Sequence, residues 1–210
     1  MLDEIITTLK RFARLFRQGP RVPRTIFLPL ALLVVAWPLL RIGLNDERTT
    51  FMVAFVLAMG LRLALQSEGT IRTTRTQMSG RATVILALVF GPGILAVLIW
   101  IGQPIWCQRF LSVYFLIMAG LYLLDLVDGK HMMVRHFLPD ERNHGADPLM
   151  TRVMAIYQLA LVLLNETLIA ETSLTVWLVY FGLLPMLSHR VLIALVRTVD
   201  EAYAKGYGRL

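Results

Sequence analysis

Six long apolar runs divide this chain, and they restrict its possible folds more than any other feature. We place them at residues 25–42, 50–65, 82–101, 110–126, 150–169 and 174–196. Each run is close to the ~20 residues that a helix needs to cross the hydrocarbon core of a bilayer. Because lipid offers no hydrogen-bond partners to the backbone, such runs cross as helices with internal hydrogen bonds. The sequence therefore predicts an all-α polytopic membrane protein with about six transmembrane helices.

Basic residues are distributed unevenly among the connections between these runs. Of the 21 Lys and Arg residues, only Arg41, Arg48 and Arg109 fall on one side of the predicted bundle. Cytoplasmic connections are enriched in Lys and Arg, so both termini are predicted to be cytoplasmic. The opposite, outer ends carry all four tryptophans, namely Trp37, Trp100, Trp106 and Trp177. An indole ring favours the headgroup level, which agrees with this arrangement.

Length and charge limit the remaining possibilities. The 210 residues are predicted to form one bundle, with an interfacial helix at 1–18, spans within 25–196 and a cytoplasmic tail at 197–210. The longest connection, 127–148, is interpreted as a loop. The net charge of +7 does not require nucleic acid as a partner, because cations beside spans are attracted to anionic headgroups at the cytoplasmic face. Cys107 is the only cysteine, so an internal disulfide is excluded.

The N-terminal segment alternates with helical periodicity between apolar and basic residues. The apolar positions are Leu2, Ile5, Ile6, Leu9, Phe12, Ala13 and Phe16. The remaining face carries Lys10, Arg11, Arg14 and Arg17. This pattern predicts an amphipathic helix at the membrane surface. It serves either as an anchor that orients the first span or as a sensor of lipid or of a partner.

Two polar pairs lie inside the predicted spans, where ionisable side chains are costly. Asn165 and Glu166 lie about a turn and a half from the outer end of the fifth span. Glu166 is expected either to pair with Arg41, Arg48 or Arg109, or to form a proton or substrate site. In the last span, His189 and Arg190 follow Pro185. They are candidate intramembrane polar residues, unless the helix kinks there and brings Arg190 to the headgroups.

The third run contains Gly91-Pro92-Gly93, which predicts a helix break within the membrane. Broken helices at the midplane form the binding sites of many transporters. The other half of the chain has no matching Gly-Pro-Gly, so a kink that allows close packing is the favoured interpretation.

Signatures of catalysis, metal or cofactor binding are weak. His131, His136 and His144 share one connection with acidic residues, but they lack the spacing and cysteine partners that zinc sites usually have. No glycine-rich phosphate loop, nucleophile elbow or Cys-x-x-Cys motif occurs. We therefore expect no enzyme activity, no catalytic residues, no cofactor and no metal site.

Four fragments, in order and at consistent spacing, resemble the bacterial inner-membrane family of intracellular septation protein A (YciB). They are Phe27-Leu28-Pro29-Leu30; Arg109 with Tyr114; Lys130 and Arg135 with Phe137-Leu138; and Asn165 with Trp177, Tyr180 and Gly182. The chain departs from the family at Phe181, where a Lys is usual, and in its longer basic N-terminus. The resemblance implies a non-enzymatic protein needed for septation and envelope integrity, with membrane-protein partners from the division and envelope machinery.

Two other classes of function are compatible with the sequence. In a lipid or small-solute transporter or channel, Asn165, Glu166 and the Gly91-Pro92-Gly93 break would line a polar cavity. In an accessory subunit of a larger membrane complex, the spans alone would provide the contacts. A scaffold should tolerate substitution of Glu166 or His189.

Overall fold

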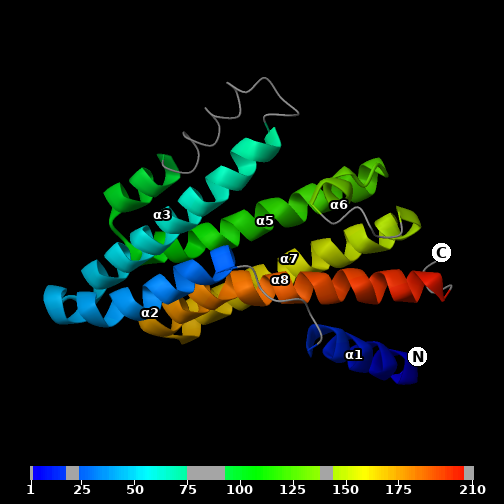
Figure 1. The fold of residues 1–210 in the computed structure, drawn as a ribbon, viewed down its shortest axis with the longest axis horizontal. Helices are drawn as coiled ribbons and strands as arrows, with labels where there is room; N and C mark the ends of the chain where they lie inside the picture. The colour runs from blue at the N-terminus through cyan, green and yellow to red at the C-terminus, as the bar shows by residue number, and fades with distance from the viewer. Residues whose placement is uncertain (1, 18–23, 75–92, 138–143, 206–210) are drawn as a thin grey trace. The chain divides into compact units, whose positions relative to one another are not determined.

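The computed structural model describes residues 2–17, 24–74, 93–137 and 144–205. Within these ranges every regular element is helical and none is a strand (Figure 1). The elements are α1 (Leu2–Arg17), α2 (Arg24–Leu44), α3 (Glu47–Thr74), α5 (Pro104–Asp128), α6 (Met132–Phe137), the 3-10 turn η1 (His144–Ala146), α7 (Asp147–Glu171) and α8 (Leu174–Ala204). Residues 93–101 are also helical. The predicted all-α class is confirmed for the described residues.

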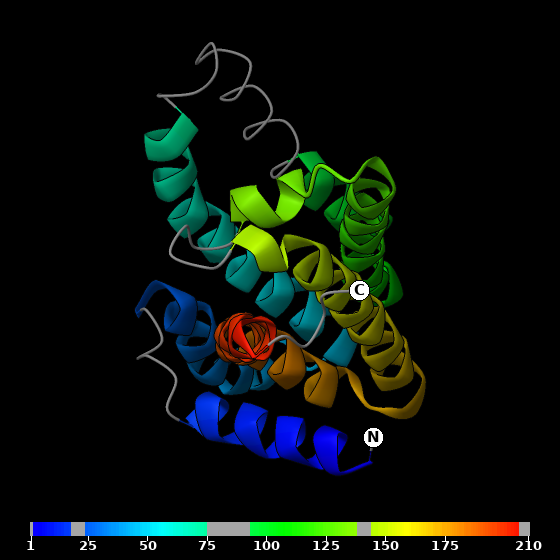
Figure 2. The ribbon, with the colours of Figure 1, turned by 90° about the vertical axis from the view of Figure 1, so that its right-hand side faces the viewer.

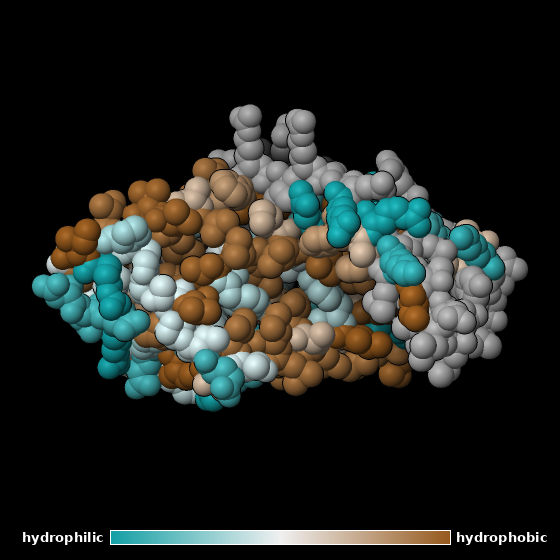
Figure 3. Space-filling model, turned by 90° about the horizontal axis from the view of Figure 1, so that it is seen from below, coloured by the Kyte–Doolittle hydropathy of each residue, from teal (hydrophilic) through white to brown (hydrophobic). Residues whose placement is uncertain are grey.

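Four helices are long and apolar enough to cross a membrane: Ile26–Leu44, Pro104–Asp128, His144–Glu171 and Leu174–Ala204. They correspond to four of the six predicted spans, and apolar side chains cover much of the face drawn in Figure 3. Of the other two predicted spans, 50–65 lies within α3, which is not among these four helices, and 82–101 is described only from residue 93 onward. The described helices are therefore consistent with a multi-pass membrane protein, while the count of six spans stays a prediction.

The turn between α2 and α3 is formed by two residues with suitable side chains. Asn45 adopts a left-handed backbone conformation (φ 48°), which asparagine tolerates better than most residues. Asp46 then caps α3, because its carboxylate accepts a hydrogen bond from the Thr49 N–H at 2.7 Å and another from the Thr49 hydroxyl. These contacts with Thr49 hold the pKa of Asp46 below its ordinary value of 3.8.

A second tight turn, before α5, is closed by an arginine. Gly102 has φ 62° and donates its N–H to the Leu98 carbonyl at 3.1 Å, a glycine termination of the preceding helix. Arg48 donates from Nε (3.0 Å) and Nη2 (2.8 Å) to the Gly102 carbonyl. Pro104, whose fixed φ suits a first helical position, then begins α5.

The described contacts divide the chain into two compact units. Unit 1 comprises Met1–Val22, Leu111–Thr167 and Met186–Leu210, and unit 2 comprises Pro23–Phe110 and Leu168–Pro185. Helices α5, α7 and α8 contribute residues to both units. We describe each unit by itself, and the predicted single bundle over residues 1–210 stays a prediction.

Aromatic rings form the centre of unit 2. Trp177 on α8 is completely buried. Its ring stacks on Phe181 at a centroid distance of 5.4 Å and contacts Phe51 at 5.7 Å. Phe55, one turn from Phe51 on α3, contacts both Trp177 (6.3 Å) and Phe181 (5.1 Å). Offset and edge contacts of this kind add stability beyond the area that the rings bury.

Gly182 allows α2 and α8 to approach closely within unit 2. A Cβ atom at this position would lie 2.9 Å from Leu30 Cδ1 and 3.0 Å from Leu33 Cδ1. Small residues at such crossings bring helix backbones together, which is a main source of packing energy in lipid. The first-span motif and the last-third motif of the sequence therefore meet at this contact.

The core of unit 1 is a separate apolar cluster formed by α5, α6, α7 and α8. Its buried members are Tyr122, Val134, Ala146, Met150, Met154, Ala155, Val196 and Val199. Gly145 in η1 lies against the Tyr203 ring, where a Cβ would come within 2.6 Å of the Tyr203 hydroxyl oxygen. The C-terminal part of α8 thus covers the start of α7.

Helix α8 is longer than predicted. It has 31 residues, continues through Pro185 and ends at Ala204; Figure 2 looks almost along its axis. The first part of the predicted cytoplasmic tail, residues 197–204, therefore continues this helix, and Val196 and Val199 pack into the core of unit 1. The connection 127–148, predicted as a loop, contains α6 and η1.

Candidate functional site

Asp125, near the C-terminal end of α5, binds the first turn of α6. Its carboxylate accepts hydrogen bonds from the Met132 N–H (2.7 Å) and the Met133 N–H (2.9 Å). The first N–H groups of a helix have no partner within the helix, and a negative charge also favours this end of the helix dipole. Asp125 is 7% exposed, so this contact attaches α6 to α5 through a largely buried carboxylate.

His131 provides a second attachment, to α7. Gly129 (φ 65°) and His131 (φ 51°) turn the chain between α5 and α6. The buried His131 ring places Nδ1 3.0 Å from Thr151 Oγ1. Thr151 donates its own hydroxyl hydrogen to the Asp147 carbonyl at 2.8 Å. Its oxygen therefore accepts from His131, which assigns the ring proton to Nδ1.

Asp147 provides the third attachment. This first residue of α7 is 1% exposed and accepts a hydrogen bond from Arg135 Nε at 2.9 Å. His144 Nδ1 lies 3.8 Å from the same carboxylate oxygen. Because half of the Arg135 side chain is exposed, its remaining guanidinium surface is available on the outside of α6.

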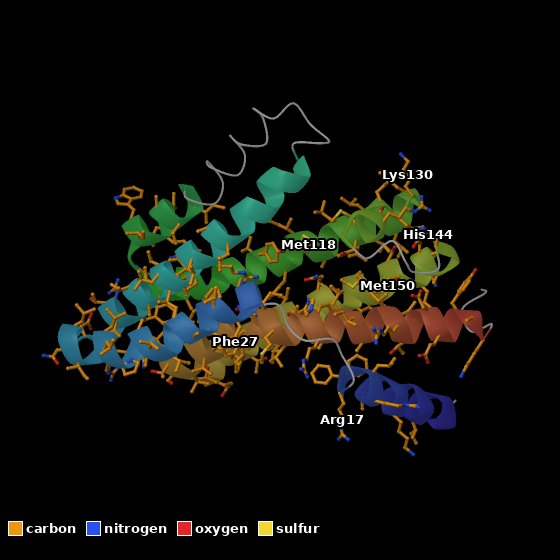
Figure 4. The ribbon with its side chains drawn as sticks, in the orientation of Figure 1. Arg17, Phe27, Met118, Lys130, His144 and Met150 are labelled. Atoms are coloured by element: carbon orange, nitrogen blue, oxygen red, sulfur yellow. The ribbon has the colours of Figure 1, made fainter. Side chains whose placement is uncertain are left out.

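We call residues 129–135 the α6 platform. Its polar attachments point inward, whereas Lys130, Met132 and Arg135 are exposed. Figure 4 shows Lys130 and His144 at the same end of unit 1. Two residues predicted to make contacts, Lys130 and Arg135, therefore lie on one short segment that three buried side chains fix in place. Such a segment can bind an anionic surface without first losing much conformational freedom.

A second polar site joins α5 and α7 within their apolar stretches. Ser112 donates to Glu166 Oε1 at 2.6 Å, and Asn165 Nδ2 donates to Ser112 Oγ at 2.8 Å. Asn165 is completely buried and Ser112 is 7% exposed. Hydrogen bonds of this kind link helices in lipid and orient the Glu166 carboxyl group.

The arginine partners predicted for Glu166 are mostly engaged elsewhere. Arg41 pairs with Glu47 at 3.5 Å, and Arg48 binds the Gly102 carbonyl. Ser112 is a hydrogen-bond partner of Glu166 that the sequence interpretation missed, because a lone serine in an apolar run carries no signal of its own. Arg109, the third candidate, is exposed, and its pairing with Glu166 stays a prediction.

The other predicted contact residues have different environments. Trp177, Tyr180 and Gly182 lie in the packing of unit 2, and the Trp177 ring meets the Tyr180 ring edge-on at 6.5 Å. Tyr114 is 48% exposed beside Phe115. Trp177 is thus a core residue, in contrast to Trp100, which is 88% exposed as expected for a ring at the headgroup level.

Three further predictions concern the spans and the histidines. His189 and Arg190 are partly buried on α8. Gly91 and Pro92 lie outside the described residues, and Gly93 is the first residue of the helix 93–101. The His136 side chain is also outside the description. Among the described side chains, no group of three or more His, Cys, Asp or Glu is arranged to hold a metal ion.

Unit 2 contains a cleft of about 380 Å³ beside Arg48. Its lining comes from one face of α3 and from the helix 93–101, and includes Met52, Val56 and Ile99. The lining is mainly apolar, with Arg48 and Thr49 as its polar members. The volume of this cleft lies within the range of known small-molecule sites.

Comparison with known protein families, curated proteins and solved structures gave no match to this chain.

Proposed function

We propose that this chain is a non-enzymatic multi-pass protein of the bacterial inner membrane that supports septation and envelope integrity through contacts within and beneath the membrane. In this proposal both termini and the α6 platform are cytoplasmic, as the distribution of basic residues indicates. The resemblance to intracellular septation protein A suggests the cellular process.

The observation that carries the proposal is the α6 platform. Asp125 and Asp147 are buried acids that hold α6 in position, while Lys130 and Arg135 present cations to the outside. A rigid basic surface at a membrane face suits an acidic partner or anionic headgroups.

The meeting of Leu30 with Gly182 adds support for the resemblance. The two residues are 152 positions apart in the sequence and come from different motifs. Their contact gives a structural reason why both motifs would occur together in one chain. The amphipathic helix α1, with Lys10, Arg14 and Arg17 exposed, would add a second cationic surface against lipid.

Charge reversal on the platform tests this function. Deletion of the gene in its bacterium should lengthen the cells, and the wild-type gene should restore their length. We expect Lys130→Glu to fail to restore length and to reduce recovery of crosslinked division proteins about tenfold, equivalent to ~1.4 kcal/mol. Arg152→Glu is the matched control, because Arg152 is exposed in the first turns of α7 but outside the platform. Equal behaviour of the two variants would refute the proposal.

A second candidate function, a lipid transporter, is favoured by the cleft beside Arg48. Its apolar lining suits an acyl chain, and Arg48 suits a phosphate. Val56→Trp should fill the cleft and reduce the lipid that co-purifies, as measured by native mass spectrometry. Val34→Trp, on an exposed face of α2, is the control. Retention of lipid by both variants, together with normal function of Glu166→Gln, would leave the scaffold as the better account.

A further inference from the structure

Helix α1 turns a mixed face outward rather than a purely polar one. Among its described side chains, the exposed ones are Ile6, Lys10, Ala13, Arg14 and Arg17. Their spacings of i, i+4, i+7, i+8 and i+11 place them on one side of a helix. Three cations therefore share the outward side with one large apolar side chain, Ile6, which is 40% exposed.

The two aromatic rings of α1 lie on its other side. Phe12 and Phe16 stack on each other at a centroid distance of 6.2 Å, and both are partly buried, as is Leu15. An amphipathic helix that apolar contacts hold in lipid inserts its large apolar side chains there. In α1 these side chains are already partly covered, so they leave little apolar area for insertion. Ile6 is the large apolar side chain that the described part of the helix still exposes.

The charge of this N-terminal segment has one sign. After Asp3 and Glu4 in the first turn, no acidic residue occurs before Asp46. Six cations lie in the same stretch ahead of the first span, namely Lys10, Arg11, Arg14, Arg17, Arg21 and Arg24. Clusters of about four to eight Lys and Arg residues beside a span or on an amphipathic helix are typical of segments that bind anionic lipid. The exposed cations of α1 thus have a chemically matched partner in a negatively charged membrane surface.

The covalent chain keeps α1 close to such a surface. Six residues separate Arg17 from Arg24, the first residue of α2. Helix α2 contains the candidate span Ile26–Leu44. The connecting chain extends over at most about 25 Å. The outward side of α1 therefore needs no other contact to stay within reach of the headgroups.

We propose that α1 is a sensor of anionic phospholipid, whose outward side binds the membrane surface where negatively charged headgroups are present. Each cation beside such a surface strengthens binding about fivefold, so that Lys10, Arg14 and Arg17 together contribute about a hundredfold. Ile6, of which 40% is exposed, adds about as much as one further cation. Charge therefore decides whether the helix is bound. An apolar anchor, the other interpretation of the sequence, would bind neutral and anionic lipid alike.

This inference deepens the proposed function, which assigns a cationic surface to α1, and it rests on the membrane location but not on the role in septation. The charge-reversal test of the proposed function concerns Lys130 and the length of cells. The sensor is tested with purified protein in vesicles. Each test can therefore fail while the other succeeds.

Accessibility of position 6 in the reconstituted full-length protein tests the sensor. In a Cys107→Ala background, which removes the only native thiol, Ile6→Cys carries a nitroxide spin label. The vesicles are phosphatidylcholine with or without phosphatidylglycerol in both leaflets, so α1 meets the same surface in either orientation of the protein. A neutral nickel chelate in the water reports exposure of the label without repulsion by the surface charge.

Phosphatidylglycerol should shield the label. A hundredfold change in the binding constant moves α1 from about one tenth bound to about nine tenths bound, so collisions with the chelate should fall about tenfold. Equal collision rates in the two kinds of vesicle overturn the proposal. A label shielded in both would indicate an apolar anchor, and a label accessible in both would indicate a helix whose partner is a protein.

Charge variants separate recognition of anionic lipid from simple attachment. Arg14→Gln combined with Arg17→Gln removes two cations and keeps α1 helical, because Gln and Arg have similar helix propensities. This variant should bind about 25-fold more weakly and leave the label accessible. Arg152→Gln combined with Lys205→Gln makes the same charge change at exposed positions outside α1 and should keep the response. A response that survives in the α1 variant, or that both double variants lose equally, contradicts the sensor.

Discussion

Unit 2 has a core of stacked aromatic rings, whereas unit 1 combines an aliphatic and methionine-rich cluster with hydrogen bonds from buried polar and charged side chains. Trp177 meets Phe51, Phe55 and Phe181 in the first case, and Asp147 meets Arg135 in the second. Lipid is as apolar as a core side chain, so burial alone gives helices little reason to associate in a membrane. In unit 2 the close fit of aromatic rings stabilises the helix packing, and in unit 1 directional hydrogen bonds fix which helix surfaces meet. One chain therefore uses both ring packing and hydrogen bonding to associate its helices.

The largest expected effect lies in the aromatic centre. Trp177→Ala should lower the free energy of unfolding by about 3–5 kcal/mol, because it leaves a cavity among rings that cannot collapse. Trp100→Ala is the control, since Trp100 is 88% exposed, and it should change stability little. Denaturant unfolding in detergent micelles measures both. Similar decreases in the free energy of unfolding for the two variants would show that ring packing around Trp177 is not the main stabilising interaction in unit 2.

Loss of a buried acid should be the next largest effect. Asp147→Ala removes the acceptor of Arg135 and should cost about 1.5–3 kcal/mol, the range for hydrogen bonds to charged groups. Hydrogen exchange should also accelerate in α6. Asp128→Ala, at an exposed residue of α5, is the control. Protection of α6 that survives Asp147→Ala would mean that Asp125 and His131 are enough to hold the platform.

The contact of Ser112 with Asn165 should contribute less. A double-mutant cycle of Ser112→Ala and Asn165→Leu should give a coupling of about 0.6–1.7 kcal/mol, as for other hydrogen bonds between membrane helices. Thr167→Val paired with Ser112→Ala should be additive, because the Thr167 hydroxyl bonds to its own helix at the Leu163 carbonyl. Additivity in both cycles would show that the hydrogen bond between Ser112 and Asn165 adds no measurable stability to unit 1.

The smallest effect concerns the cap of α3 in unit 2. The pKa of Asp46 is held below 3.8 by the Thr49 hydroxyl and N–H groups. The cap therefore stabilises the helix fully above pH 3.8 and loses its effect as the pH falls through the lowered pKa. Circular dichroism should show a small loss of helix in Asp46→Ala at neutral pH and less in Asp46→Asn, which can still cap. A pH-independent difference between wild type and Asp46→Ala would contradict this assignment.

The helices themselves could be predicted from apolar runs, because lipid leaves the backbone no alternative. Their ends were less predictable. Helix α7 begins at Asp147, before the predicted 150, since Asp147 is fixed by Arg135 and His144 rather than by hydropathy. Residues 197–204 are likewise helical, and Val199 among them packs into the core of unit 1. Hydropathy along the sequence does not show this contact.

The candidate sites were predictable in residue type but not in partnership. Lys130 and Arg135 stood out through the resemblance, yet the attachment of α6 to Asp125 depends on a turn through residues with positive φ. Trp177 was interpreted as a marker of the headgroup level, which is a tendency of the residue type. Its burial is decided by Phe51 and Phe55 on another helix, and spacing along α8 cannot show that.

Helix α8 is longer than the hydrocarbon core of a bilayer is thick. Its 31 residues extend over about 46 Å at 1.5 Å per residue, whereas hydrocarbon is only ~30 Å thick. An untilted α8 would therefore project several turns into water. Soluble proteins near the membrane surface could contact those projecting turns, on which Glu201 is exposed.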